Sequence, residues 1–240
     1  MEKLIVKTFK YLTLAAVAAF TFTANAGTPF RMHAKAPVHK VDKYIFGYGG
    51  VNLGSDYHTT GSFFEPGPGN NAIPLDWSTE AGFNVGGGIG IYSCFMGGSR
   101  FEIEGSYGEN NMDTFAYNNV ALYPSEFVGQ ISTATVMVNF LKEIPLGKAT
   151  GYFGGGIGGA NSQFKGNYYY LPVNERDGGF AWQLIAGVDL PINDCIALFT
   201  QYKFQSIHGI EYNTVFGDFP FSTDEAITSH SVQAGLRFSF

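Results

Sequence analysis

Eight segments of the chain place apolar and polar residues alternately, and this pattern limits the possible folds more than any other feature. The alternation is clearest in residues 99–108, 179–190, 195–206 and 229–240. Period two is the spacing of a β-strand, because successive side chains point to opposite faces. The full set of expected strands covers residues 44–54, 79–92, 99–108, 128–141, 150–162, 179–190, 195–206 and 229–240. Most of them are ten to fourteen residues long, and a tilted strand needs about 9–11 residues to cross a bilayer.

The connections between these strands alternate in length. Short connections lie near 93–98, 142–149 and 191–194, and long connections lie near 55–78, 109–127, 163–178 and 207–228. Short periplasmic turns that alternate with long external loops are typical of outer-membrane barrels. Lipid offers no hydrogen-bond partners, so a sheet inside it must close and lose its edges. The sequence therefore predicts an all-β fold, an eight-stranded antiparallel up-and-down transmembrane β-barrel over residues 44–240, with both ends in the periplasm.

A soluble β-sandwich would also alternate, and the composition of 14% charged residues, 16% aromatic residues and 32 glycines fits either fold. Two features favour the barrel. Charged residues stand in the middle of strands, where a polar lumen tolerates them and a dry sandwich core does not. Aromatic residues also crowd the expected strand ends, as in the belts at lipid–water boundaries. They are Tyr44, Phe46, Tyr48, Tyr92, Tyr107, Phe140, Tyr152, Phe153, Trp182, Phe238 and Phe240.

The first 26 residues have the features of a secretory signal peptide. Lys3, Lys7 and Lys10 precede a short apolar stretch, and residues 24–26 (ANA) give the small-x-small pattern of a cleavage site. We expect cleavage near Ala26, a flexible periplasmic segment over residues 27–43, and export to the outer membrane of a Gram-negative bacterium. The net charge of −6 argues against nucleic acid as a partner.

Four segments resemble one known family. They are RFEIEGSYG (100–108), TVMVNFLKEIPLGKATGYFGGGIGGA (135–160), GFAWQLIAGVDLPINDCIALFTQYKF (179–204) and HSVQAGLRFSF (230–240). They are similar to segments of the opacity-protein and OmpA-like eight-stranded barrels of Gram-negative surface proteins. The resemblance implies a porin-like surface barrel and makes Phe238 and Phe240 part of a terminal signal for the barrel-assembly machinery. That family includes adhesins, surface antigens and membrane–wall stabilisers, so the resemblance leaves the function open.

Alternation places six charged residues on the face expected to line the lumen: Arg100, Glu102, Glu104, Asp189, Lys203 and Arg237. Buried charges must be paired and hydrogen-bonded, because desolvation of each one costs several kcal/mol. One hypothesis is that they form a network that plugs the pore. The alternative is that they are separate, wetted lumen residues.

Cys94 and Cys195 both fall at short turns, which places them on the periplasmic rim. Export would allow a disulfide between them, and two separate thiols remain the alternative. The glycine clusters at 86–88, 154–156 and 158–159 open no expected helix, so they predict barrel curvature and space beside bulky neighbours, not a nucleotide site.

The long connections are rich in acidic and aromatic residues. They fit contact with lipopolysaccharide, with host or cell-surface ligands, or a merely hydrated surface on which parts fold back to extend the strands. No cofactor or metal motif is found. His230, Ser231, His208 and Glu211 are the only candidates for a lipid A-modifying enzyme, and adjacent strand residues such as His230 and Ser231 face opposite sides. We therefore expect a non-enzymatic surface protein of structural, adhesion or antigen type, with a narrow channel or carrier for small solutes or hydrophobic molecules as the alternative.

Overall fold

The computed structural model describes most of the chain after residue 42. The described residues are 43–53, 56–63, 71–93, 98–117, 120–122, 127–168, 171–216, 219–224 and 226–240. The expected signal peptide, nearly all of the 27–43 segment and Cys94 lie outside them. Within the described residues, no helix has the length and apolar character needed to span a membrane.

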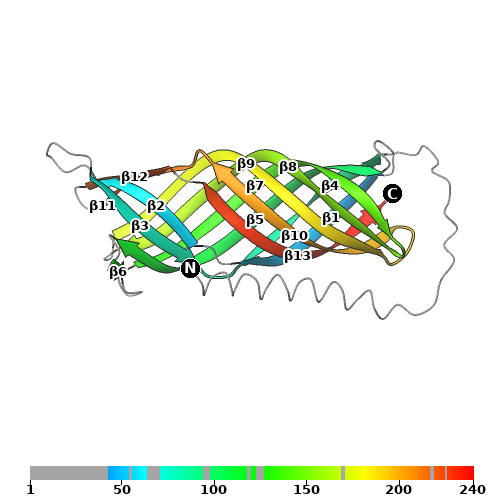
Figure 1. The fold of residues 1–240 in the computed structure, drawn as a ribbon, viewed down its shortest axis with the longest axis horizontal. Coiled ribbons are helices and arrows are strands. Elements are labelled where there is room, and N and C mark those ends of the chain that lie inside the picture. The colour runs from blue at the N-terminus through cyan, green and yellow to red at the C-terminus, as the bar shows by residue number, and fades with distance from the viewer. Residues whose placement is uncertain are drawn as a thin grey trace. The chain divides into compact units, whose positions relative to one another are not determined.

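Eight strands form a closed antiparallel ring, which confirms the predicted barrel (Figure 1). In ring order the strands are β1 (Lys43–Leu53), β4 (Gly82–Ser93), β5 (Ser99–Tyr117), β7 (Phe127–Leu146), β8 (Ala149–Tyr168), β9 (Leu171–Pro191), β10 (Ile196–His208) and β13 (Ile227–Ser239). The last strand pairs back with the first, from Tyr44 opposite Ser239 to Leu53 opposite His230. Closure satisfies the hydrogen bonds that a free sheet edge would leave open.

Four of these strands are longer than the sequence pattern predicted. β5, β7, β8 and β9 contain 19, 20, 20 and 21 residues. The connection expected over 163–178 is instead the end of the β8–β9 hairpin, which stays paired as far as Tyr168 opposite Leu171. The prediction ended each strand where the apolar alternation ended, but backbone pairing continues where the outer face becomes polar.

The other long connections also contain strands. β2 (Asp56–Phe63) pairs with β3 (Asn71–Thr79), and β11 (Glu211–Phe216) pairs with β12 (Phe219–Asp224). Together with β5 they form a sheet in the order β11–β12–β2–β3–β5, and the short strand β6 (Val120–Leu122) also pairs with β5. The expectation that parts of these connections extend the strands agrees with this arrangement.

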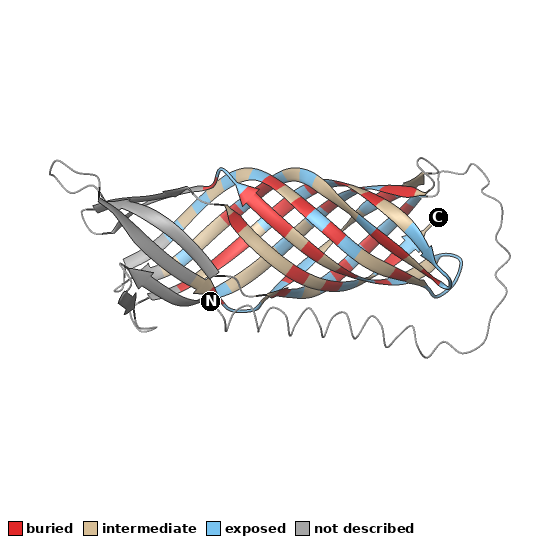
Figure 2. Cartoon of the chain, in the orientation of Figure 1, coloured by how far each residue is buried: buried red, intermediate tan, exposed pale blue. Residues whose placement is uncertain are grey.

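Buried and exposed residues alternate along the strands (Figure 2). The exposed face is apolar, with exposed fractions of 64% for Val136, 61% for Ile157 and 59% for Ile89. The buried face is largely polar and includes charged residues from four strands. A water-soluble protein has the opposite arrangement, so the barrel is built for an apolar surrounding.

The structure corrects one part of the aromatic assignment. Tyr44, Phe46, Tyr48 and Tyr152 were expected at the lipid–water boundary, but they are at most 7% exposed and lie inside the barrel. In β1 both faces carry large apolar groups, so alternation alone could not show which face is internal.

Candidate functional site

The six charged residues predicted to line the lumen all lie inside the barrel. Arg100, Glu102 and Glu104 come from β5, Asp189 from β9, Lys203 from β10 and Arg237 from β13, and none is more than 6% exposed. Each occupies an inward position because it alternates with an exposed or half-exposed apolar or aromatic neighbour on its own strand. The structure brings them together in two layers along the lumen.

The first layer centres on Asp189, which lies between two arginines. Its Oδ2 accepts a hydrogen bond from Arg100 Nη1 at 2.8 Å and another from Arg237 Nη1. Arg237 Nη2 also lies 3.7 Å from Glu102 Oε1, and Arg100 Nε lies 3.3 Å from Glu143 Oε1. These ion pairs join β5, β7, β9 and β13 across the bore.

Aromatic rings support the same layer. Arg100 lies over the ring of Tyr152 at 4.1 Å, and Arg237 lies over the ring of Tyr44 at 4.9 Å. Tyr44 also donates its hydroxyl hydrogen bond to Glu102 Oε1 at 2.7 Å. Each guanidinium is therefore compensated both by carboxylates and by aromatic faces.

The second layer centres on Glu104, which accepts hydrogen bonds from four strands. Its donors are Lys203, Tyr48, Asn139 Nδ2 at 2.7 Å and Gln183 Nε2 at 2.9 Å. Lys203 Nζ also donates to the Tyr48 hydroxyl at 2.9 Å. A buried carboxylate needs this degree of pairing to offset the loss of its hydration.

Glycines on β4 make room for the tyrosines of β1. A Cβ atom added at Gly90 would lie 2.2 Å from Cζ of Tyr44, and one added at Gly86 would lie 2.3 Å from the hydroxyl oxygen of Tyr48. These contacts are far too short for real atoms, so any larger residue would push the rings off their carboxylate partners. The structure thus gives the glycine cluster at 86–88 the predicted role of space beside bulky neighbours.

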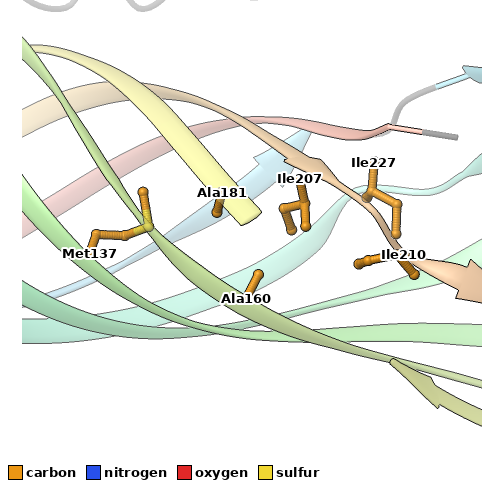
Figure 3. Packing of buried hydrophobic residues seen from close by; sticks show 6 residues of the cluster. All are labelled: Met137, Ala160, Ala181, Ile207, Ile210 and Ile227. Carbon is orange, nitrogen blue, oxygen red and sulfur yellow. The ribbon is translucent and has the colours of Figure 1, made fainter. Parts of the chain in front are cut away.

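An apolar cluster fills part of the lumen beyond the second layer. Its side chains converge from β7, β8, β9, β10, β13 and the residues after β10 (Figure 3), and they are Met137, Ala160, Ala181, Ile207, Ile210 and Ile227. Gly209 has a φ of +74°, a left-handed conformation that glycine adopts readily. This turn follows β10 and directly precedes Ile210, which is 1% exposed within the cluster.

A cavity of about 50 Å³ with a mixed polar and apolar lining lies against Ile207 and Ile227 of the apolar cluster. Asn52, Asn84, Ser106 and Gln205 are among the side chains that line it, and Lys203 of the second layer also contributes. Asn84 is only 6% exposed, and its Oδ1 has no hydrogen-bond partner among the described residues. The cavity has room for a few water molecules.

Sequence reasoning missed several members of the network. Glu143, Asn139, Gln183, Tyr44 and Tyr48 all contact the predicted charges. Asn139 lies in a segment where alternation is weak, and the two tyrosines were assigned to the outer boundary. Their inward positions become clear only when each strand is aligned with its neighbours in the closed ring. The residue pattern of a single strand does not give that alignment, so the register between strands was the missing information.

The candidate catalytic residues do not assemble into a triad among the described side chains. His230 Nδ1 lies 2.5 Å from the Tyr202 hydroxyl, whereas Ser231 is buried and accepts a hydrogen bond from Gln233 at 3.0 Å. His208 Nε2 lies 3.0 Å from Ser206 Oγ and accepts a hydrogen bond from Trp182 Nε1 at 3.1 Å. The side chain of Glu211 is outside the described part.

Within the described residues no group of three His, Cys, Asp or Glu side chains is placed to hold a metal ion. Cys195 is exposed and has no disulfide partner among the described residues. Because Cys94 lies outside the described residues, a disulfide between the two remains a prediction.

Comparison with known proteins shows likeness only in structure. No family model and no curated protein matches the sequence. One similar solved structure is Neisserial surface protein A, with 12% identity and a TM-score of 0.48 over 82% of this chain and 97% of that one. Ail, the attachment invasion locus protein of Yersinia pestis, has 12% identity and a TM-score of 0.40 over 84% and 100%. The outer-membrane protease OmpT of Escherichia coli has 7% identity and a TM-score of 0.46 over 82% and 97%. From its own closed ring of strands, the chain is an all-β, eight-stranded antiparallel barrel.

Proposed function

We propose that the protein is a non-enzymatic surface barrel of the outer membrane, with a closed lumen and an external sheet that makes contacts outside the cell. The observation that carries this proposal is the charged network that crosses the bore at Asp189 and again at Glu104. An eight-stranded barrel has an interior just wide enough for its own side chains. Two paired layers and the apolar cluster therefore fill the lumen instead of lining a channel.

The apolar exterior supports the membrane location. On β9, exposed or half-exposed apolar side chains run from Phe180 to Leu190, a span of about 25 Å along the membrane normal at a strand tilt of about 40°. That height agrees with the apolar band of about 25 Å on outer-membrane barrels. Phe238 and Phe240 are 40% and 75% exposed at the end of β13, positions accessible to assembly machinery.

The lengths of the connections support an orientation in which the extended ends of the long strands face the outside of the cell. The β7–β8 turn consists of Gly147 and Lys148, whereas the connections at the other end contain the hairpins β2–β3 and β11–β12. Short turns face the periplasm in barrels of this kind. The external sheet is then the part that meets lipopolysaccharide or host and cell-surface ligands.

We expect the purified protein, inserted in planar lipid bilayers, to show no large, stable conductance. Replacing Arg100, Asp189 and Arg237 of the first layer and Glu104 and Lys203 of the second layer with alanine should raise the conductance, because it removes the charged side chains that cross the bore. Ile157→Ala, on the outer face, is the control and should leave the conductance unchanged. A large stable pore in the unaltered protein would contradict the closed lumen.

A narrow channel is the second candidate, and the cavity next to Lys203 favours it. For solutes to pass from this cavity through the barrel, both charged layers would have to move. Liposome swelling distinguishes the two functions, because a channel admits small solutes at rates that a closed barrel cannot match.

Protease treatment of whole cells should cut within 55–78, 109–127, 163–178 or 207–228 and should leave the short turns intact. Within 163–178, residues paired between β8 and β9 should resist cleavage, since a protease binds an extended, unpaired backbone. Mass spectrometry of the released peptides gives the cut sites. Cuts in 142–149 or 191–194 on intact cells would show that the barrel has the opposite orientation in the membrane.

A further inference from the structure

The outer surface of β7, β8 and β9 changes from apolar to polar between two adjacent rows of paired residues. The last apolar row is Val136, Gly159 and Phe180. The next rows outward are Ala134, Asn161 and Gly178, then Ser132, Gln163 and Arg176, then Gln130, Lys165 and Asn174. This change marks where the hydrocarbon of the bilayer ends on this side of the barrel.

Beyond this boundary, basic and acidic residues lie on opposite faces of the strands. Lys165 and Arg176 are exposed and lie on the outward face, in the same alternation as exposed Ile157 and Phe180. Glu175 and Asp177 occupy the alternate positions of β9, which face inward. The two basic residues that the sequence places in an otherwise acidic region thus meet on one outward surface.

No carboxylate lies within ion-pair distance of Lys165 or Arg176 among the described side chains. On the outward face, Glu109 belongs to the same row as Arg176, but Ser132 and Gln163 lie between them. Three strand spacings separate the two by about 14 Å. Glu109 also accepts a hydrogen bond from the Tyr107 hydroxyl at 2.9 Å. The two positive charges are therefore directed at the surroundings of the barrel.

Neighbouring amides hold these cations in one small area. Lys165 pairs with Asn174, so Arg176 is its diagonal neighbour, with Cα atoms about 7–8 Å apart. Arg176 Nη2 donates to Gln163 Oε1 at 3.3 Å, and Gln163 Nε2 donates to Asn174 Oδ1 at 2.8 Å. One side of the guanidinium is fixed in this way, and its remaining N–H groups can bind an anion.

We propose that Gln163, Lys165, Asn174 and Arg176, here called the outer basic patch, bind the phosphate headgroup of an outer-leaflet lipid. Arg176 lies four residues beyond Phe180, which is about 10 Å along the membrane normal at a strand tilt of about 40°. The headgroup layer begins just beyond Phe180, and the long side chains of Arg176 and Lys165 can reach back toward it. Acyl chains would cover the apolar rows below, so a single phosphorylated lipid contacts both surfaces. This proposal rests on the membrane location proposed above.

The test compares lipid A carrying both phosphates with the same lipid A after its phosphates are removed. Each is titrated, in phosphatidylcholine nanodiscs, into the full barrel, and bound lipid is counted by native mass spectrometry. A cation near an anionic headgroup contributes about fivefold in affinity, so the two together give a preference on the order of 25-fold for the phosphorylated form. The double variant Lys165→Gln with Arg176→Gln should lose this preference.

The matched control is Lys43→Gln with Lys148→Gln, which removes the same charge from exposed sites at the opposite end of the barrel. It should keep the preference. Equal binding of the two lipids by the unaltered barrel, or equal loss in the control, would overturn the proposal. Displacement of the lipid by inorganic phosphate at equal concentration would also overturn it, because the patch would then bind a free anion. Failure of the barrel to float with vesicles would instead refute the membrane location itself.

Discussion

Asp189→Leu should lower the free energy of unfolding by about 3–5 kcal/mol, because it leaves two buried guanidinium groups without their shared carboxylate. Arg100 and Arg237 are 0% and 2% exposed, and both donate to Asp189. Glu102 and Glu143 lie at the longer distances of 3.7 and 3.3 Å and cannot replace a direct contact. Urea unfolding of the refolded barrel in lipid vesicles, followed by tryptophan fluorescence, measures the change.

A compensated variant is the control for this experiment. Replacing Arg100 and Arg237 with methionine, and Glu102 and Glu143 with glutamine, in the Asp189→Leu background removes all the charges of this layer together and should recover most of the lost stability. Arg100 Nε and Nη2, Arg237 Nε and Asp189 Oδ1 already lack hydrogen bonds among the described residues, so the intact layer is itself costly to bury. If Asp189→Leu unfolds at the same urea concentration as the unaltered barrel, the ion pairs of Asp189 do not stabilise the fold.

Gly90→Ala should destabilise the barrel by about 2–3 kcal/mol, because its methyl group would overlap the ring of Tyr44. The ring cannot easily move away. It is fully buried, it packs against Tyr92 with ring centroids 4.6 Å apart, and its hydroxyl binds Glu102. The same unfolding measurement in vesicles gives the size of the effect.

Gly49→Ala is the matched control on the adjacent strand. Gly49 lies on the outer face of β1, and a Cβ atom there would meet nothing within 4 Å. This variant should change the stability by less than about 0.5 kcal/mol. Equal effects of the two variants would show that glycine acts here through backbone freedom, and not through the space it leaves for tyrosine.

Much of the fold could be predicted because alternation in some strands is unambiguous. In β10, Gln201, Lys203 and Gln205 are buried while Leu198 is exposed, as their polarity suggested. β13 shows the same order, with Arg237 inside and Leu236 and Phe238 outside. An apolar residue at every second position is what a strand with lipid on one side requires.

The prediction failed in strands whose two faces carry similar residue types. In β8, Gly and Ala stand on both faces, so the inward position of Tyr152 was not recognised. Strand ends failed for a different reason. Hydrophobic alternation reports only the part of a strand that lipid covers, whereas hydrogen bonds between β8 and β9 continue beyond it to Tyr168 and Leu171.

The sequence by itself determined the number of barrel strands, their antiparallel order and the face on which Arg100, Glu104, Lys203 and Arg237 would lie. These properties are local, since each follows from which residues alternate along one strand. Only the tertiary structure decided that Asp189 meets both arginines and that Glu104 meets Lys203 and Tyr48. Partners across the bore depend on the register of all eight strand pairs together, and alternation within a single strand carries no information about that register.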